Sequence, residues 1–223
     1  MIRSIFFKEW LKTRIVVILS ILLSLALCAY LLLSTSRLID LNGTMPVWDT
    51  LLNRDVVLIE LLRYLPLIVG VLLGIAQCLP EMTQKRIKLT LHLPIDNWKS
   101  IGCMVLYGAI VMIVLAVLDL GVCLIVLAKW LPAELLLRIF LTACVWYLAG
   151  LLAYFFAVWI ALEPTWKMRI LELIFAGACM RGFFMTSMPE TYNAFLPIML
   201  IFTILCAALP MISINRFKQG IGL

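Results

Sequence analysis

Apolar stretches long enough to cross a lipid bilayer recur along the whole chain. A helix needs about 20 residues to span roughly 30 Å of hydrocarbon, and six runs approach that length. The second run is interrupted near its start by Glu60 and Arg63, and the fifth, which contains Glu172 and Arg181, is the weakest. The predicted spans cover residues 15–34, 56–79, 101–127, 139–162, 170–188 and 194–214.

The composition supports a membrane protein. Of 223 residues, 65% are hydrophobic and 13% are charged, whereas soluble domains carry about 25% charged residues. The runs lack the alternation of polar and apolar residues that marks the strands of membrane barrels, and backbone groups in lipid must be bonded internally. We therefore predict an all-α integral membrane protein in which residues 1–223 form a single transmembrane domain.

Lysine and arginine residues are distributed unequally between the connections. Twelve lie before the first span, after the second and fourth spans, and in the C-terminal tail, against four or five in the connections on the other side. Positive charge favours the cytoplasmic side, so both termini are predicted to lie in the cytoplasm. The net charge of +6 reflects this asymmetry and does not indicate binding of nucleic acid.

Residues 1–14 are too polar to span the membrane and too apolar for a free tail. On a helix, polar residues fall on one side and large apolar residues on the other. This pattern predicts an amphipathic helix in the membrane interface with its lysines toward the headgroups; the alternative is a set of charges that only orients the first span. The polar stripe is Ser4, Lys8 and Lys12, and the apolar side is Ile2, Phe6 and Trp10.

The connection 80–100 is the longest one on the cytoplasmic side and carries a basic cluster. Pro80 is expected to end the second span, with Glu81 at the start of a new turn. Pro94 and Asp96 are typical of a stop and a cap before the third span. From the residues alone, a docking surface for a partner and a plain anchoring loop are equally good interpretations.

The chain resembles the permease subunit of an ABC exporter of the ABC-2 type, over essentially its whole length. The resemblance rests on the N-terminal segment "FFKEWLKTR", on six spans with both ends inside, and on the loop "PEMTQKRIKLTLHLPID". In that family this loop is the coupling helix that docks on the ATPase. One departure is Ile87-Lys88, where family members often have Gly-Thr.

The resemblance implies a set of partners and a docking site. Two permease chains, identical or different, would pair with two ABC ATPase subunits in the lipid bilayer of the bacterial cytoplasmic (inner) membrane, with ATP and Mg²⁺ bound by the ATPase. The resemblance also identifies the residues expected to contact that ATPase, which are Glu81, Gln84, Lys85, Arg86 and Lys88.

Three ionisable residues lie within predicted spans, where charges are costly and are functional candidates. Asp119 is near the outer end of the third span, Glu172 is near the inner end of the fifth, and Arg181 is deeper in the fifth. We hypothesise that Asp119 and Arg181 form an ion pair. The alternatives are side chains that reach toward water and static contacts within the bundle.

The sequence contains few signs of chemistry of its own. It has no GxxxxGK[ST] phosphate loop, so ATP hydrolysis is expected in a separate subunit and no cofactor in this chain. No catalytic residue is predicted, because the single histidine, His92, lies in a loop. The seven cysteines have no CxxC spacing and are expected to be buried and reduced, and no metal site is predicted.

A non-transporting scaffold or anchor in a maturation or secretion complex with an ATPase remains the alternative function.

Overall fold

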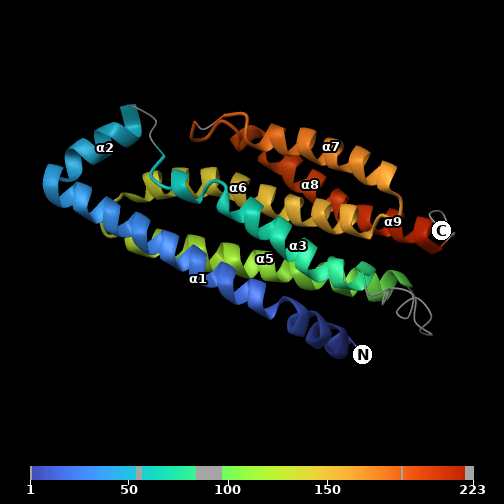
Figure 1. Ribbon diagram of the computed structural model, residues 1–223. Coiled ribbons are helices and arrows are strands. Elements are labelled where there is room, and N and C mark those ends of the chain that lie inside the picture. Colours follow the sequence, from blue (N-terminus) through green and yellow to red (C-terminus); the bar gives the residue numbers. More distant parts are fainter. Residues whose placement is uncertain (1, 54–56, 84–96, 187, 219–223) are drawn as a thin grey trace.

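The computed structural model describes residues 2–53, 57–83, 97–186 and 188–218, and every regular element in these ranges is a helix. Figure 1 shows the helices packed lengthwise in one elongated bundle. The elements are α1 (Ile2–Asn42), α2 (Thr44–Asn53), η1 (Glu60–Leu62), α3 (Leu65–Thr83), α5 (Asn97–Leu127), α6 (Ala133–Leu162), α7 (Trp166–Phe183), η2 (Asn193–Phe195), α8 (Leu196–Cys206) and α9 (Leu209–Lys218).

The chain passes along the bundle in alternating directions through α1, α3, α5, α6, α7 and then α8 with α9, so that its two termini lie at the same end (Figure 1). We call this the terminal end. Five segments of the described residues are long and apolar enough to cross a membrane, and this part of the chain is that of a multi-pass, all-helical protein. They are Arg3–Leu41, Glu60–Thr83, Trp98–Leu127, Ala133–Leu162 and Asn193–Arg216.

The predicted fifth span corresponds to α7, which is not among those five segments. It has 18 residues, about 27 Å at 1.5 Å per residue, and so has the length of the hydrocarbon core. It also contains four charged residues, which are too many for α7 to count among the segments apolar enough to cross a membrane. Six spans and a cytoplasmic location of both termini therefore stay predictions. The charged residues of α7 are Lys167, Arg169, Glu172 and Arg181.

The N-terminal segment is helical, but it is not a separate interfacial helix. Helix α1 runs without interruption over 41 residues, about 60 Å. The sequence from residue 2 to residue 42 contains neither glycine nor proline, so nothing breaks the helix between the predicted interfacial part and the first span. The first turns pack on the bundle, because Glu9 and Thr13 are both buried.

Several predicted helix ends also differ from the structure. Helix α3 continues past Pro80 to Thr83, although proline lacks the backbone donor and its ring crowds the carbonyl oxygen four residues earlier. Helix α6 begins at Ala133, six residues before the predicted span. The predicted sixth span is split into α8 and α9 at Ala207 and Ala208. Pro210 explains the split, because it cannot donate to the carbonyl oxygen of Cys206, where α8 ends.

Helix α6 is the centre of the bundle and contacts α3, α5, α7, α8 and α9. Its closest neighbour is α3, which approaches it through small residues. A Cβ atom added at Gly150 would lie 2.6 Å from the Pro66 carbonyl oxygen, and one at Gly74 would lie 2.7 Å from Cβ of Ala157. The two helices are also joined by the Tyr154 hydroxyl group, which donates to Oε1 of Gln77 at 2.8 Å. Small residues and a buried hydrogen bond thus hold α3 and α6 together, as in other membrane bundles.

Two cysteines from α1 and α5 provide a direct test of this packing. The Sγ atoms of Cys28 and Cys123 are 3.4 Å apart in the buried core, and a disulfide of about 2.05 Å needs only a small approach. In a variant that retains only these two cysteines, oxidation of membranes with diamide is expected to give a single intramolecular disulfide, detected by mass spectrometry of unreduced peptides. A variant that retains only Cys28 and Cys206 should stay reduced. If the two variants behave alike, the register of α1 against α5 is wrong.

Candidate functional site

Of the five residues predicted to contact an ATPase, only Glu81 lies in the described part of the chain. Gln84, Lys85, Arg86 and Lys88 fall in residues 84–96, outside the described ranges. Glu81 lies in α3 and is 3% exposed. Its carboxylate faces α1, where it is 2.7 Å from Nζ of Lys12 and 2.9 Å from Nζ of Lys8. Glu81 therefore binds within the chain and does not present a free carboxylate to a partner.

Glu81 belongs to a group of four charged side chains, Lys8, Glu9, Lys12 and Glu81, which we call the α1–α3 charge cluster. Lys12 lies between both carboxylates, because its Nζ is also 2.6 Å from Oε1 of Glu9. The Lys12 side chain is 10% exposed, against 44% for Lys8. The prediction that both lysines face the headgroups is thus wrong for Lys12. Lys12 pairs with both buried carboxylates, and the more exposed Lys8 supplies the second positive charge that balances them.

Neutral hydrogen bonds extend the cluster to α5. Thr13 donates to the Glu9 carbonyl oxygen at 2.9 Å. Its hydroxyl oxygen can therefore accept from the hydroxyl group of Tyr107, 2.8 Å away. Phe6 packs edge-on against the same tyrosine ring at a centroid distance of 5.6 Å. The first turns of α1 are thus fixed to α3 and α5.

A second polar group joins α6, α7 and α9 at the terminal end. The fully buried Glu163 accepts from Ser213 at 2.6 Å and from Thr165 at 3.0 Å, and lies 3.6 Å from Arg216. Glu172, which we singled out as an intramembrane charge, is buried beside Glu163. Its position makes it part of the packing between α7 and α6 at the end of the bundle.

Asp119 lies in the bundle interior, and the hypothesis that it pairs with Arg181 is wrong. Its Oδ2 atom accepts a hydrogen bond from the Tyr147 hydroxyl group at 3.1 Å, while its Oδ1 atom is buried without a partner. Arg181 is exposed on α7, a helix that packs against α6, whereas Asp119 is on α5. The sequence suggests that Arg181 could reach outward toward Asp119, but it does not show that α6 lies between their helices.

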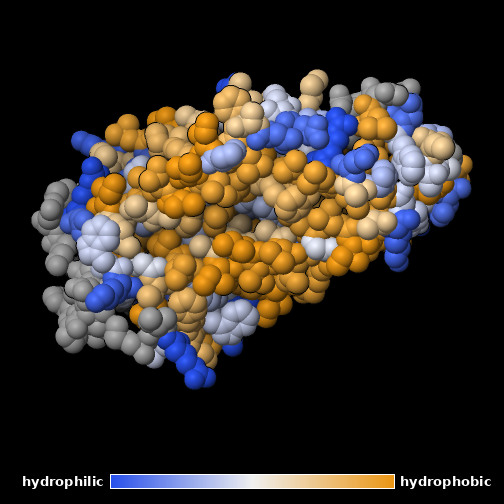
Figure 2. Space-filling view, turned by 180° about the vertical axis from the view of Figure 1, so that it is seen from behind, coloured by the Kyte–Doolittle hydropathy of each residue, from blue (hydrophilic) through white to orange (hydrophobic). Residues whose placement is uncertain are grey.

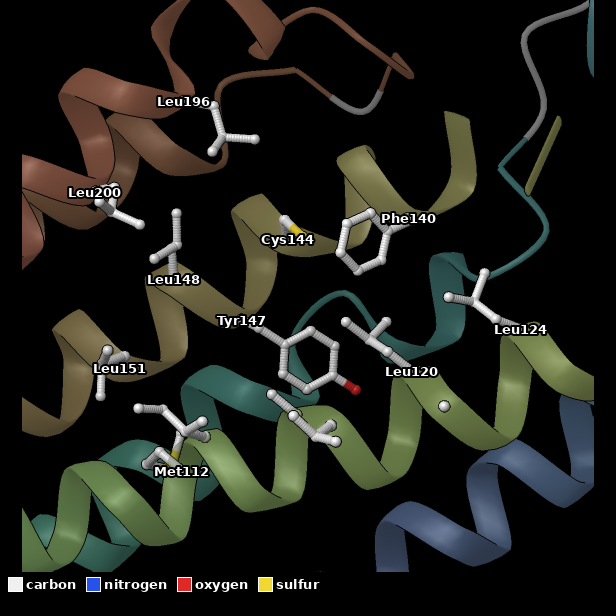
Figure 3. Close-up of a pocket in the computed structure, with 14 residues that line it drawn as sticks. Met112, Leu120, Leu124, Phe140, Cys144, Tyr147, Leu148, Leu151, Leu196 and Leu200 are labelled. Carbon is white, nitrogen blue, oxygen red and sulfur yellow. The ribbon is translucent and has the colours of Figure 1, made fainter. Parts of the chain in front are cut away.

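Tyr147 also forms a wall of an apolar groove of about 470 Å³. The groove lies between α5, α6 and α8, on the face that Figure 2 shows as broadly apolar and hollowed near its middle. Figure 3 shows the Tyr147 ring reaching from α6 toward α5, with Leu196 and Leu200 of α8 along another side. Almost all of the lining is hydrocarbon, so the groove suits acyl chains or apolar side chains.

Sequence reasoning missed Glu9, Lys12 and Tyr147 as members of these polar groups. A signal existed for the first two, since Glu9 and Lys12 stand three apart on a helix and can pair. A signal also existed for Tyr147, because a buried tyrosine hydroxyl group requires a polar partner. What the sequence lacked was the identity of that partner on another helix.

Within the described ranges no three His, Cys, Asp or Glu side chains come together in a way that could hold a metal ion. The chain was also compared with protein-family models, with curated proteins and with solved structures, and none of the three comparisons finds a match. Any assignment of function must therefore be argued from the site geometry and from the sequence.

Proposed function

We propose that this chain is the permease subunit of an ATP-driven exporter of the ABC-2 type in a bacterial cytoplasmic membrane. It forms part of the membrane pathway together with a second permease chain. It binds a separate ABC ATPase through the basic segment 84–96, which contains Lys85, Arg86 and Lys88. ATP and Mg²⁺ belong to that partner, and this chain supplies no catalytic residue.

The α1–α3 charge cluster is the observation that carries this proposal. It lies at the end of α3, at most a turn before the basic segment begins, and joins α3 to the first turns of α1 through Lys12 and Glu81. A partner that pushes on the segment therefore acts on two helices that are already fixed to each other. A plain anchoring loop would not need a buried ion cluster at its base.

A movement of α3 would be transmitted to α6. Because Gly70 and Gly74 bring the backbone of α3 against α6, a displacement of α3 along its axis cannot be absorbed by flexible side chains between them. Helix α6 in turn contacts α7, α8 and α9. Binding of an ATPase at the terminal end would thus shift the central helix of the bundle, which is the coupling that alternating access requires.

The test is co-purification with a candidate ABC ATPase produced together with this chain. A K85A/R86A double variant is expected to bind that ATPase about tenfold more weakly or worse, which corresponds to a loss of about 1.4 kcal/mol. The matched control is R37A/K129A, which removes two exposed cations from the opposite end of the bundle and should bind normally. Equal binding by both variants would contradict docking at 84–96.

The rate of ATP hydrolysis distinguishes an exporter from the alternative of a non-transporting scaffold. If the chain is an exporter subunit, the rate of ATP hydrolysis by the ATPase in proteoliposomes should depend on this chain. That rate should be lower with the K85A/R86A variant than with the unmodified chain. An ATPase that binds through the basic segment but hydrolyses ATP at the same rate with or without the chain would indicate an anchoring role instead.

A further inference from the structure

Asp119 is a buried carboxyl group without a cation beside it. It is 3% exposed and lies eight residues before the end of α5. Among the described residues, the groups that face it come from α1, α3, α5 and α6, and none is a lysine, arginine or histidine. They are Ser20, Ser24 and Cys28 of α1, Leu65, Pro66 and Val69 of α3, Met112, Leu115 and Cys123 of α5, and Tyr147 of α6.

An ionised carboxylate does not suit these surroundings. Isolated charges in an apolar interior are strongly disfavoured and normally become neutral or find an ionic partner. Here one donor, the Tyr147 hydroxyl group, reaches Oδ2, and Oδ1 has no hydrogen-bond partner. Asp119 therefore lacks the two or three donors that usually stabilise a buried carboxylate.

One further hydroxyl group shares a small cavity with Asp119. Ser24 lines the same small cavity of about 10 Å³ as Asp119 and donates its own hydrogen to the Ile21 carbonyl oxygen at 3.1 Å. Its oxygen is thus left as an acceptor. A carboxylate offers no hydrogen to such an oxygen, whereas a carboxylic acid offers one.

We propose that Asp119, Tyr147 and Ser24 form a proton-binding site, in which Asp119 carries the proton on Oδ1 in the resting protein. The protonated Oδ1 points into the cavity beside Ser24, and Oδ2 keeps the hydrogen bond from Tyr147. Release of the proton leaves a carboxylate in a largely apolar interior, so release requires water to reach the contact between α1 and α5. This site stands independently of the proposed function, since it involves neither the ATPase nor a transported substrate.

The site is tested with dicyclohexylcarbodiimide, an apolar reagent that modifies protonated carboxyl groups in membranes. The carboxyl O–H adds across one C=N bond, with oxygen going to the central carbon and hydrogen to nitrogen, and the acyl group then moves to nitrogen to give a stable N-acylurea. Membranes are treated between about pH 5 and about pH 9, a range that covers the pKa values of buried carboxyl groups. Mass spectrometry is expected to find the adduct on Asp119 at low pH and a decreasing yield as pH rises, and D119N should lack it.

Infrared spectroscopy provides a readout that does not depend on access of the reagent. A protonated Asp119 gives a carboxylic acid C=O band above the amide I band, and this band disappears in D119N. The proposal is supported if the band is present, whether or not the reagent reaches the site. It is overturned if neither band nor adduct occurs while the buried Glu172 is labelled, or if Na⁺ at constant pH abolishes both signals, since Na⁺ would then occupy the site in place of the proton.

Discussion

Replacement of Lys12 by methionine is expected to lower the free energy of unfolding by about 3–5 kcal/mol, the usual result of removing one partner from a buried ion pair. Lys12 is the cation that contacts both Glu9 and Glu81. Without it, Glu9 is a buried carboxylate that no other cation of the described residues pairs with, and within the same ranges Glu81 keeps Lys8 alone. Methionine preserves the volume of the side chain, so the loss reports on charge. Thermal unfolding of the purified protein in detergent, followed by tryptophan fluorescence, measures the effect.

The four members of the cluster allow two controls for this experiment. K8M removes the more exposed lysine from the same carboxylate, and exposed ion pairs contribute about 1 kcal/mol or less. The double variant K12M/E9Q removes the stranded carboxylate together with its cation, so it should lose less stability than K12M alone, a coupling typical of neighbouring charges. If K12M is no more destabilising than K8M, the cluster is not the buried anchor of α1.

Alanine at Gly70 is the second substitution with a large expected effect. The added Cβ atom would collide with the carbonyl oxygen of Gly150, a backbone atom that moves only if α3 and α6 separate. Overpacking generally destabilises by about 1–3 kcal/mol, and we expect about 3 kcal/mol here because no flexible side chain can yield. The same thermal unfolding assay measures the loss.

Gly121 provides the matched control, since it also lies inside a long helix but has nothing within 4 Å of an added Cβ atom. G121A should therefore raise stability by up to about 1 kcal/mol, because alanine favours helix over glycine. The decisive result is that G70A lowers the free energy of unfolding whereas G121A raises it. Equal responses would mean that α3 and α6 are not in backbone contact.

The apolar runs were sufficient to predict the helices and most of their positions, because in lipid hydrophobicity and helix formation are required by the same physics. The N-terminal segment shows where this reasoning fails. Its charges suggested an interfacial helix, since a lone lysine such as Lys12 belongs at the headgroups. In the structure Lys12 is buried, because α3 supplies Glu81 as a partner.

Polar contacts between helices could not be derived from the sequence for a related reason. Depth along a predicted span can be counted in residues, and this gave each of Asp119 and Arg181 an expected position along its helix. The rotation of each helix and the order of neighbours cannot be counted in this way. Nothing in the pattern around Asp119 indicates that Tyr147 of α6, and not Arg181 of α7, faces it. The end of α3 beyond Pro80 depends likewise on the cluster that holds Glu81.

The charge cluster also sets an order of events during synthesis. Lys12 and Glu81 are 69 residues apart, so the ribosome completes all of α1 before the residue that neutralises its first turns exists. Until α3 has been synthesised, Lys12 lacks Glu81, and the charges in the first turns of α1 are only partly neutralised. Burial of Lys12 as the structure shows it therefore has to wait for α3.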